Sequence, residues 1–126
     1  MKVNHVGYWV ECIYHSVNTF KMLGYKQKSD VFYDAEKDCF ICFFDNDSTR
    51  VKLIEPASQS FLHELLGEDF EQDFHICYET TDFENAILNL QQQGFELFEQ
   101  YEDIAVTNGV FMFNDKEGFI EIRKAG

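Results

Sequence analysis

The sequence is poor in basic residues, with 10 Lys and Arg against 23 Asp and Glu. The resulting net charge of −13 argues against nucleic acid as a partner, because phosphate binding needs a basic face. No apolar run approaches the roughly 20 residues that a membrane-spanning helix needs, so we expect no membrane association. Met1 and Lys2 lead directly into an alternating segment without the features of a signal peptide. A cytoplasmic protein is the resulting expectation.

The chain also lacks a second CxxC motif to complement the one formed by Cys39 and Cys42. A structural zinc site built on CxxC motifs needs further ligands of this kind. The motif lies in an apolar, alternating segment typical of a β-strand, where residues three apart point to opposite faces. We therefore predict two reduced, buried thiols at these positions instead of a zinc or redox site.

What the sequence does contain is a repeat with an offset of 70 residues, the separation of His5 from His75. The strand-like segment around each histidine is followed by a helix-like segment, which ends at Gly24 in the first copy and at Gly94 in the second. Further matched pairs of segments are 40–45 with 110–115 and 51–53 with 120–122. The repeat indicates a duplicated half-domain.

Hydrophobic periodicity predicts the same order of elements in both halves. Module one, residues 1–56, is predicted as strand 3–10, helix 15–23 and strands 25–34, 38–44 and 50–56. Module two, residues 73–126, is predicted as a first strand, a helix that starts from a Thr81–Glu84 capping box, and strands 95–99, 109–114 and 119–123. Residues 57–72 are predicted as a connector with one or two helical turns, and residues 100–108 as a loop. The predicted fold class is α+β in a single domain of residues 1–126: two pseudo-symmetric βαβββ modules form a curved mixed sheet around a central cleft.

Strand alternation assigns two residues of each module to the cleft. If the bulkier face of each first strand covers its helix, His5 and His75 face the cleft, and the same parity on the last strands gives Lys52 and Glu121. Two imidazoles and a carboxylate match the ligand set of a divalent transition metal. Open positions on that metal would take two substrate oxygens, and the ion would act as a Lewis acid on an enolate-like intermediate. The ammonium of Lys52 argues against a metal, because it repels the ion.

Five segments carry a resemblance to a known family. They are VNHVGY at 3–8, FKMLGY at 20–25, VKLIEP at 51–56, FHICYE at 74–79 and GFIEI at 118–122. In this order and spacing they resemble the vicinal oxygen chelate superfamily, in particular its glyoxalase I-like and methylmalonyl-CoA epimerase-like members. The resemblance covers essentially the whole chain.

The resemblance implies paired βαβββ modules around a metal-lined cup, commonly in a homodimer. Because the family's ligands come from the first and last strand of each module, it implies that His5, His75 and Glu121 bind a divalent metal such as Zn, Ni, Co, Mn or Fe. The remaining ligand position, Glu or Gln in the family, is Lys52 here. That departure argues against the four-ligand chemistry of glyoxalases and epimerases, and it leaves open both a metal on the three remaining ligands and a cup without metal.

Three functions stay open at this point. The first is a glyoxalase/epimerase-like lyase or isomerase that acts on a small oxygenated substrate through metal chelation and an enediolate-type intermediate. In it Glu121 moves the proton, and in a metal-free variant Lys52 supplies the positive charge. The second is a non-catalytic ligand- or drug-binding protein that resembles bleomycin resistance proteins, with Lys52 paired to Glu121 and a flat aromatic or cationic ligand. The third is an extradiol-type dioxygenase, since that class holds iron with His, His and Glu alone.

Overall fold

The computed structural model describes residues 1–57, 74–97 and 107–125. The chain divides into two compact units, and each is described by itself. The N-terminal unit is His5–Phe74, and the C-terminal unit is His75–Gly126 together with Met1–Asn4. None of the helices in the described part of the chain is long and apolar enough to cross a membrane.

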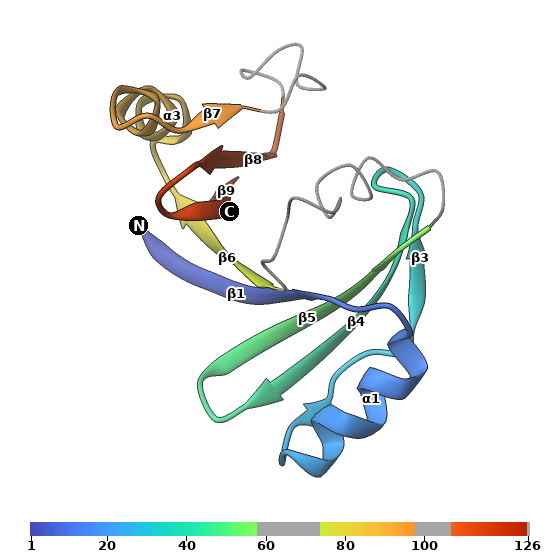
Figure 1. Cartoon of the computed structure of the whole chain (residues 1–126). Helices are drawn as coiled ribbons and strands as arrows, with labels where there is room; N and C mark the ends of the chain where they lie inside the picture. Colours follow the sequence, from blue (N-terminus) through green and yellow to red (C-terminus); the bar gives the residue numbers. More distant parts are fainter. Residues whose placement is uncertain (58–73, 98–106, 126) are drawn as a thin grey trace. The chain divides into compact units, whose positions relative to one another are not determined.

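The N-terminal unit combines one helix with a mixed sheet (Figure 1). Its elements are β1 (Lys2–Trp9) from His5 onward, α1 (Ile13–Met22), β2 (Lys26–Gln27), β3 (Phe32–Asp34), β4 (Cys39–Asn46) and β5 (Thr49–Pro56). β4 and β5 form an antiparallel hairpin, and both β2 and β3 pair antiparallel with β4. β1 pairs parallel with β5, with Gly7 opposite Lys52 and Tyr8 opposite Leu53.

Helix α1 covers one face of this sheet. Its buried residues Ile13 and Val17 are one helical turn apart and pack against side chains of β4 and β5. Those partners are Cys42, Phe44, Val51 and Leu53. The amide of Ile13, at the start of the helix, donates to Glu55 Oε1 over 2.9 Å, which satisfies one of the open N–H groups of the first turn. Gly24, with φ of 94°, follows the helix in the left-handed conformation that glycine favours.

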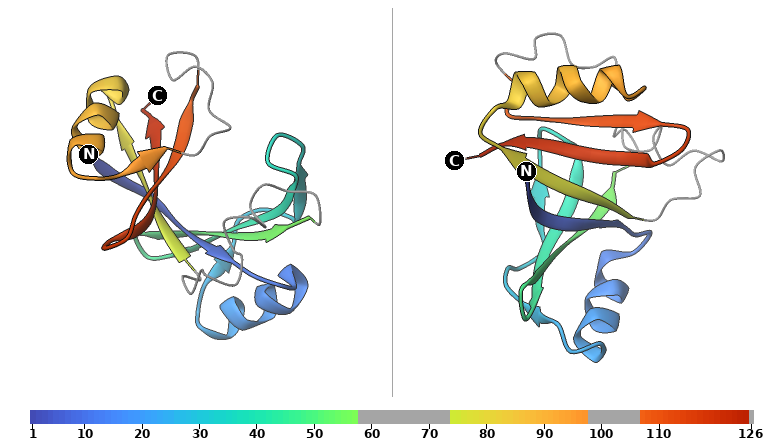
Figure 2. Two further views of the ribbon diagram at one scale, coloured as in Figure 1. Left: turned by 45° about the horizontal axis from the view of Figure 1, so that its top comes forward. Right: turned by 90° about the vertical axis from the view of Figure 1, so that its left-hand side faces the viewer.

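The C-terminal unit repeats the scheme with its own helix and sheet. Its elements are β6 (Phe74–Thr80), α3 (Phe83–Gln92), β7 (Glu96–Leu97), β8 (Gly109–Asn114) and β9 (Gly118–Lys124). β6 pairs parallel with β9, whereas β8 pairs antiparallel with both β9 and β7. Figure 2 shows α3 lying along one face of this sheet, where Phe83 and Ile87 pack against Val110, Met112 and Ile122.

The α+β class and the two βαβββ modules predicted from the repeat are confirmed. Tyr8 lies opposite Leu53 in the first module, and Tyr78 lies opposite Ile122 in the second, so the parallel pairing follows the repeat. The predicted helix 15–23 begins earlier, at Ile13. The predicted connector 57–72, apart from its first residue, lies outside the described residues, as does most of the predicted loop 100–108.

Two local predictions were wrong. The predicted strand 25–34 is two short strands, β2 and β3, with an interruption around Ser29. The predicted capping box is absent: the N-cap of α3 is Asp82, which makes no side-chain capping bond.

The burial predicted for the two thiols of the CxxC motif is confirmed. Both cysteines are buried and free. Cys42 lies in the core beneath α1, whereas Cys39 belongs to the opposite face of β4. Burial raises the pKa of both thiols, to about 11 for Cys39, which keeps them in the neutral form.

Candidate functional site

The candidate site of the C-terminal unit lies on the face of β6 and β9 that turns away from α3. Tyr78 and Ile122 pack on the α3 side, so alternation sends His75, Cys77 and Glu121 to the other side. Cys77 and Glu121 are direct partners in the parallel register. All three side chains are buried, with exposed fractions of 0% for His75 and Cys77 and 3% for Glu121.

His75 and Glu121 form a close pair within this unit. The distance between His75 Nε2 and Glu121 Oε1 is 3.2 Å, within hydrogen-bonding reach. The ring of Phe111 meets the imidazole edge to face, with centroids 5.2 Å apart and an interplanar angle of 74°. A carboxylate taken out of water this completely is costly unless a donor or a cation compensates it, so the imidazole is a substantial part of what holds Glu121 in place.

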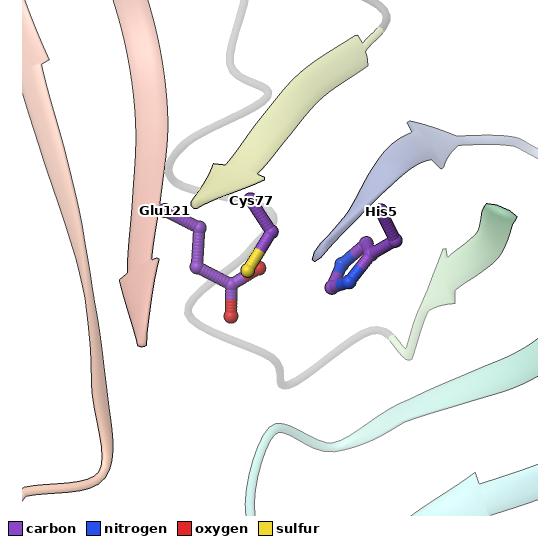
Figure 3. Close-up of side chains that lie close together, drawn as sticks. All are labelled: His5, Cys77 and Glu121. Carbon is purple, nitrogen blue, oxygen red and sulfur yellow. The ribbon is translucent and has the colours of Figure 1, made fainter. Parts of the chain in front are cut away.

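Cys77 is the site residue that sequence reasoning missed. Its thiol lies within 4.8 Å of a carboxylate oxygen of Glu121, and Figure 3 shows the two side chains projecting from β6 and β9. The sequence did hold a signal for it, because Cys77 has the same strand parity as His75. A free cysteine in an apolar strand is usually an inert core residue, however, and that interpretation prevailed.

The corresponding face of the N-terminal unit carries the two remaining predicted residues. His5 on β1, drawn in Figure 3, and Lys52 on β5 are both buried, with exposed fractions of 2% and 5%. Lys52 Nζ lies 5.9 Å from the ring centroid of Phe43, its register partner on β4. Phe43 in turn stacks on Phe32, with centroids 6.2 Å apart. This face therefore combines a buried cation with stacked aromatic rings.

The two faces carry opposite charges at equivalent register positions. Gly7 faces Lys52 across β1 and β5, just as Cys77 faces Glu121 across β6 and β9. Lys52 thus occupies in one unit the place that Glu121 occupies in the other. The structure brings His75 and Glu121 together in one unit, and it places His5 and Lys52 on the equivalent face of the other.

The donor chemistry of the C-terminal unit fits a divalent transition metal. An imidazole nitrogen and a carboxylate oxygen, both buried and carried by paired strands, are ligands that zinc, cobalt, nickel and iron accept. The thiol of Cys77 adds a soft donor on the same face. The ammonium of Lys52 is not a ligand unless it loses its proton.

Residues 4–113 match the family described as the Glyoxalase/Bleomycin resistance protein/Dioxygenase superfamily. The chain belongs to this superfamily. None of the curated proteins matches it. Solved structures that resemble this superfamily member do so at low sequence identity, and the likeness concerns the fold.

Three such structures illustrate the likeness. A hypothetical protein from Bacillus halodurans C-125 superposes with a TM-score of 0.77 at 15% identity, over 99% of this chain and 94% of the other. Methylmalonyl-CoA epimerase from Mycobacterium tuberculosis gives a TM-score of 0.68 at 15% identity, over 99% and 88%. A variant of methylmalonyl-CoA epimerase from Streptomyces coelicolor, in complex with 2-nitronate-propionyl-CoA, gives a TM-score of 0.69 at 14% identity, over 100% and 98%.

Proposed function

We propose that this superfamily member is a lyase or isomerase of the glyoxalase/epimerase kind that acts on a small oxygenated substrate. Its divalent metal is held by His75 and Glu121 of the C-terminal unit. The observation that carries the proposal is the buried pair of His75 Nε2 and Glu121 Oε1, 3.2 Å apart on two paired strands. The likeness in fold to methylmalonyl-CoA epimerases supports an isomerase over other reactions of the superfamily.

The proposed reaction needs two groups near one carbon atom of the substrate: one stabilises the developing negative charge, and the other moves the proton. When bound, the metal would supply Lewis-acid stabilisation of the charge that develops on a substrate oxygen as the neighbouring carbon loses its proton. Glu121 has two carboxylate oxygens, so Oε1 can stay beside His75 while Oε2 accepts that proton and returns it. Phe111 and Phe119, both buried, would keep water away from the exchange.

The first test is the metal content of the full chain. Protein purified from medium supplemented with divalent metals should carry about one ion per chain. The His75→Ala variant should carry almost none. His15→Ala is the matched control, since His15 is exposed on α1, and it should keep the metal. Absence of metal from the supplemented wild-type protein would overturn the proposal.

The second test measures hydrogen exchange at the acidic carbon of the substrate. Metal-loaded protein in deuterated water should catalyse hydrogen exchange at the acidic carbon of a branched acyl thioester such as methylmalonyl-CoA or of a related 2-oxo compound, detected by NMR. Glu121→Gln should abolish the exchange, because the amide cannot accept the proton. A Glu121→Gln protein that still exchanges at the wild-type rate would remove Glu121 as the base.

A second function, ligand binding without catalysis, is favoured by one specific observation. Lys52 stands at the register position equivalent to Glu121, and Phe43 and Phe32 are stacked beside it. In this function the stacked rings, with the cation of Lys52 beside Phe43, hold a flat aromatic ligand. Metal-free protein should then bind anilinonaphthalene sulfonate, a flat aromatic probe, and Phe43→Ala should weaken that binding. Equal affinity in the two proteins would contradict this second function.

A further inference from the structure

We propose that the N-terminal unit binds a flat aromatic acid, with the carboxylate of the ligand on the buried ammonium of Lys52 and its ring against Phe43 and Phe32. The inference rests on the second proposed function, ligand binding by the stacked rings, and it adds the charge that the ligand must carry. All the residues that it uses belong to the N-terminal unit.

Lys52 lies in a row of three residues across neighbouring strands of this unit (Figure 1). Its register partner on β4 is Phe43, and its partner on β1 is Gly7. The row belongs to the face away from α1, because the chain neighbours Leu53 and Phe44 pack beneath that helix. Paired residues leave the sheet on the same face, so the ammonium has an aromatic ring on one side and a residue without a side chain on the other. A ligand on this face meets the cation and the ring together.

Two rings and two aliphatic side chains supply the apolar part of this face. Phe43 and Phe32 are stacked, with centroids 6.2 Å apart and an interplanar angle of 27°. Ile41 is the register partner of both Phe32 on β3 and Ile54 on β5, and both isoleucines are buried. Phe32 is 43% exposed, so solvent reaches one end of the stack. A planar ring that packs there exchanges water for apolar and aromatic contacts.

The spacing of the cation and the ring fits a carboxylate joined directly to an aromatic ring. Lys52 Nζ lies 5.9 Å from the ring centroid of Phe43. Packed aromatic rings prefer centroid separations of about 4.5–7 Å. A hydrogen bond from an ammonium to a carboxylate is about 2.7–2.9 Å long. One molecule of the size of a naphthoate can therefore pack its ring against Phe43 and place its carboxylate on Lys52.

The charge of Lys52 selects an acid over a base. A buried ammonium is stabilised by an anion, and its three N–H donors allow it to bind a carboxylate beside the contacts that it already makes. The net charge of −13 repels an acid at long range, but exposed charges are screened beyond about 8 Å at physiological ionic strength, whereas a buried contact is screened much less. A cationic aromatic ligand would meet a like charge at this position.

The experiment compares two probes of nearly the same shape, the anion 2-naphthoate and the neutral 2-naphthamide, by calorimetric titration of the full chain in the presence of a chelator. Wild-type protein should bind the naphthoate at least about tenfold more tightly than the amide. Trp9, the single tryptophan of the chain, shares the strand parity of Gly7, so its fluorescence should change as either probe binds to this face.

Three variants test the assignment to Lys52. Lys52→Gln should lose the preference for the naphthoate and keep its affinity for the amide, whereas Lys52→Arg should restore most of the preference because it restores the charge. Lys26→Gln is the matched control, since Lys26 is exposed on β2 of the same unit, and it should keep the preference. Circular dichroism checks that each variant folds, and the comparison of the two probes on wild-type protein depends on no variant.

The outcomes separate this inference from the function on which it rests. Equal affinity of the wild-type protein for the two probes would overturn the role of Lys52 and leave ligand binding by the stacked rings intact. A preference that survives in Lys52→Gln, or that disappears in Lys26→Gln, would also overturn it by assigning the anion to another residue. Failure of the wild-type protein to bind either probe would overturn the second proposed function and this inference with it.

Discussion

The buried histidine of the C-terminal unit allows a quantitative prediction for metal-linked stability. A ligand that binds only the native state at about 100 times its dissociation constant stabilises that state by about 2.7 kcal/mol. Unfolding this 126-residue chain has an entropy of about 265 cal/mol/K, at about 2.1 cal/mol/K per residue. The ratio of the two gives a rise in Tm of about 10 °C on adding zinc to the apoprotein.

The perturbation is His75→Gln, chosen because simple truncation carries a separate cost. His75→Ala removes the imidazole 3.2 Å from a carboxylate that is only 3% exposed, and breaking such a buried pair costs about 3 kcal/mol or more without any metal. The Gln amide can still donate a hydrogen bond to Glu121, so its apoprotein should stay closer to the wild-type Tm. An amide is a poor ligand for zinc, however, and the rise of about 10 °C should shrink to about 2 °C or less.

Differential scanning calorimetry with chelator and with excess zinc measures both quantities in one series. His15→Ala is the control for the loss of a histidine, since His15 is exposed on α1, and it should keep the full rise. A His75→Gln protein that gains as much as the wild type would show that zinc binds elsewhere. A wild-type protein that gains nothing, although its apoprotein melts cooperatively, would refute metal binding to the native state.

Two further predictions concern single side chains. Burial raises the pKa of the Cys39 thiol from 9.0 to about 11, so the native state keeps a proton that the unfolded chain has lost, and the free energy of unfolding should fall by up to about 3 kcal/mol as the pH rises through this interval. Urea unfolding near both limits should show a smaller fall in Cys39→Ala, and an equal fall in both proteins would contradict the assignment. Glu55→Ala should cost about 1 kcal/mol in urea unfolding because the amide of Ile13 loses its acceptor, whereas Glu55→Gln keeps an acceptor oxygen and should cost less; equal costs would point to a cause other than the cap.

The repeat and the hydrophobic periodicities of strand and helix were enough to predict the modules, because each periodicity is encoded in residues close together in sequence. The interruption after β2 was not accessible in this way. The chain near Ser29 joins β4 through a side chain, with the Ser29 hydroxyl accepting from the amide of Phe43 over 3.0 Å. Nothing in the alternation of residues 25–34 distinguishes that bond from an ordinary strand ladder.

The predicted start of α3 was wrong for a similar reason. Thr81 and Glu84 have the spacing of a capping box, but the amide of Asp82 donates to Thr80 Oγ1, and the amide of Asn85's side chain donates to Asp82 Oδ2. These competing polar contacts shift the helix start by one residue. Short polar side chains near a helix end offer several local bonding patterns, and sequence spacing alone does not rank them.

For the candidate site, strand parity was sufficient to predict which face a single residue occupies, but not which residues lie next to it. Alternation placed His75 and Glu121 on the face away from the helix, and both are buried there. That Glu121 lies opposite Cys77 depends on the register between β6 and β9, whose residues are more than 40 positions apart. Register is fixed by the packing of the whole sheet, so the position of Cys77 beside Glu121 became visible only in the structure.

The repeat shows where the two modules differ at equivalent positions of the strand register. At the two paired positions of the N-terminal unit stand Gly7, without a side chain, and Lys52, a cation. At the equivalent positions of the C-terminal unit stand Cys77 and Glu121, two groups that bind a metal as anions. Neither of the two N-terminal positions offers a ligand, whereas both C-terminal positions do. The cation at Lys52 therefore argues against a second, symmetric set of ligands in the N-terminal unit, and the proposed ligands His75 and Glu121 both lie in the unit that carries these donors.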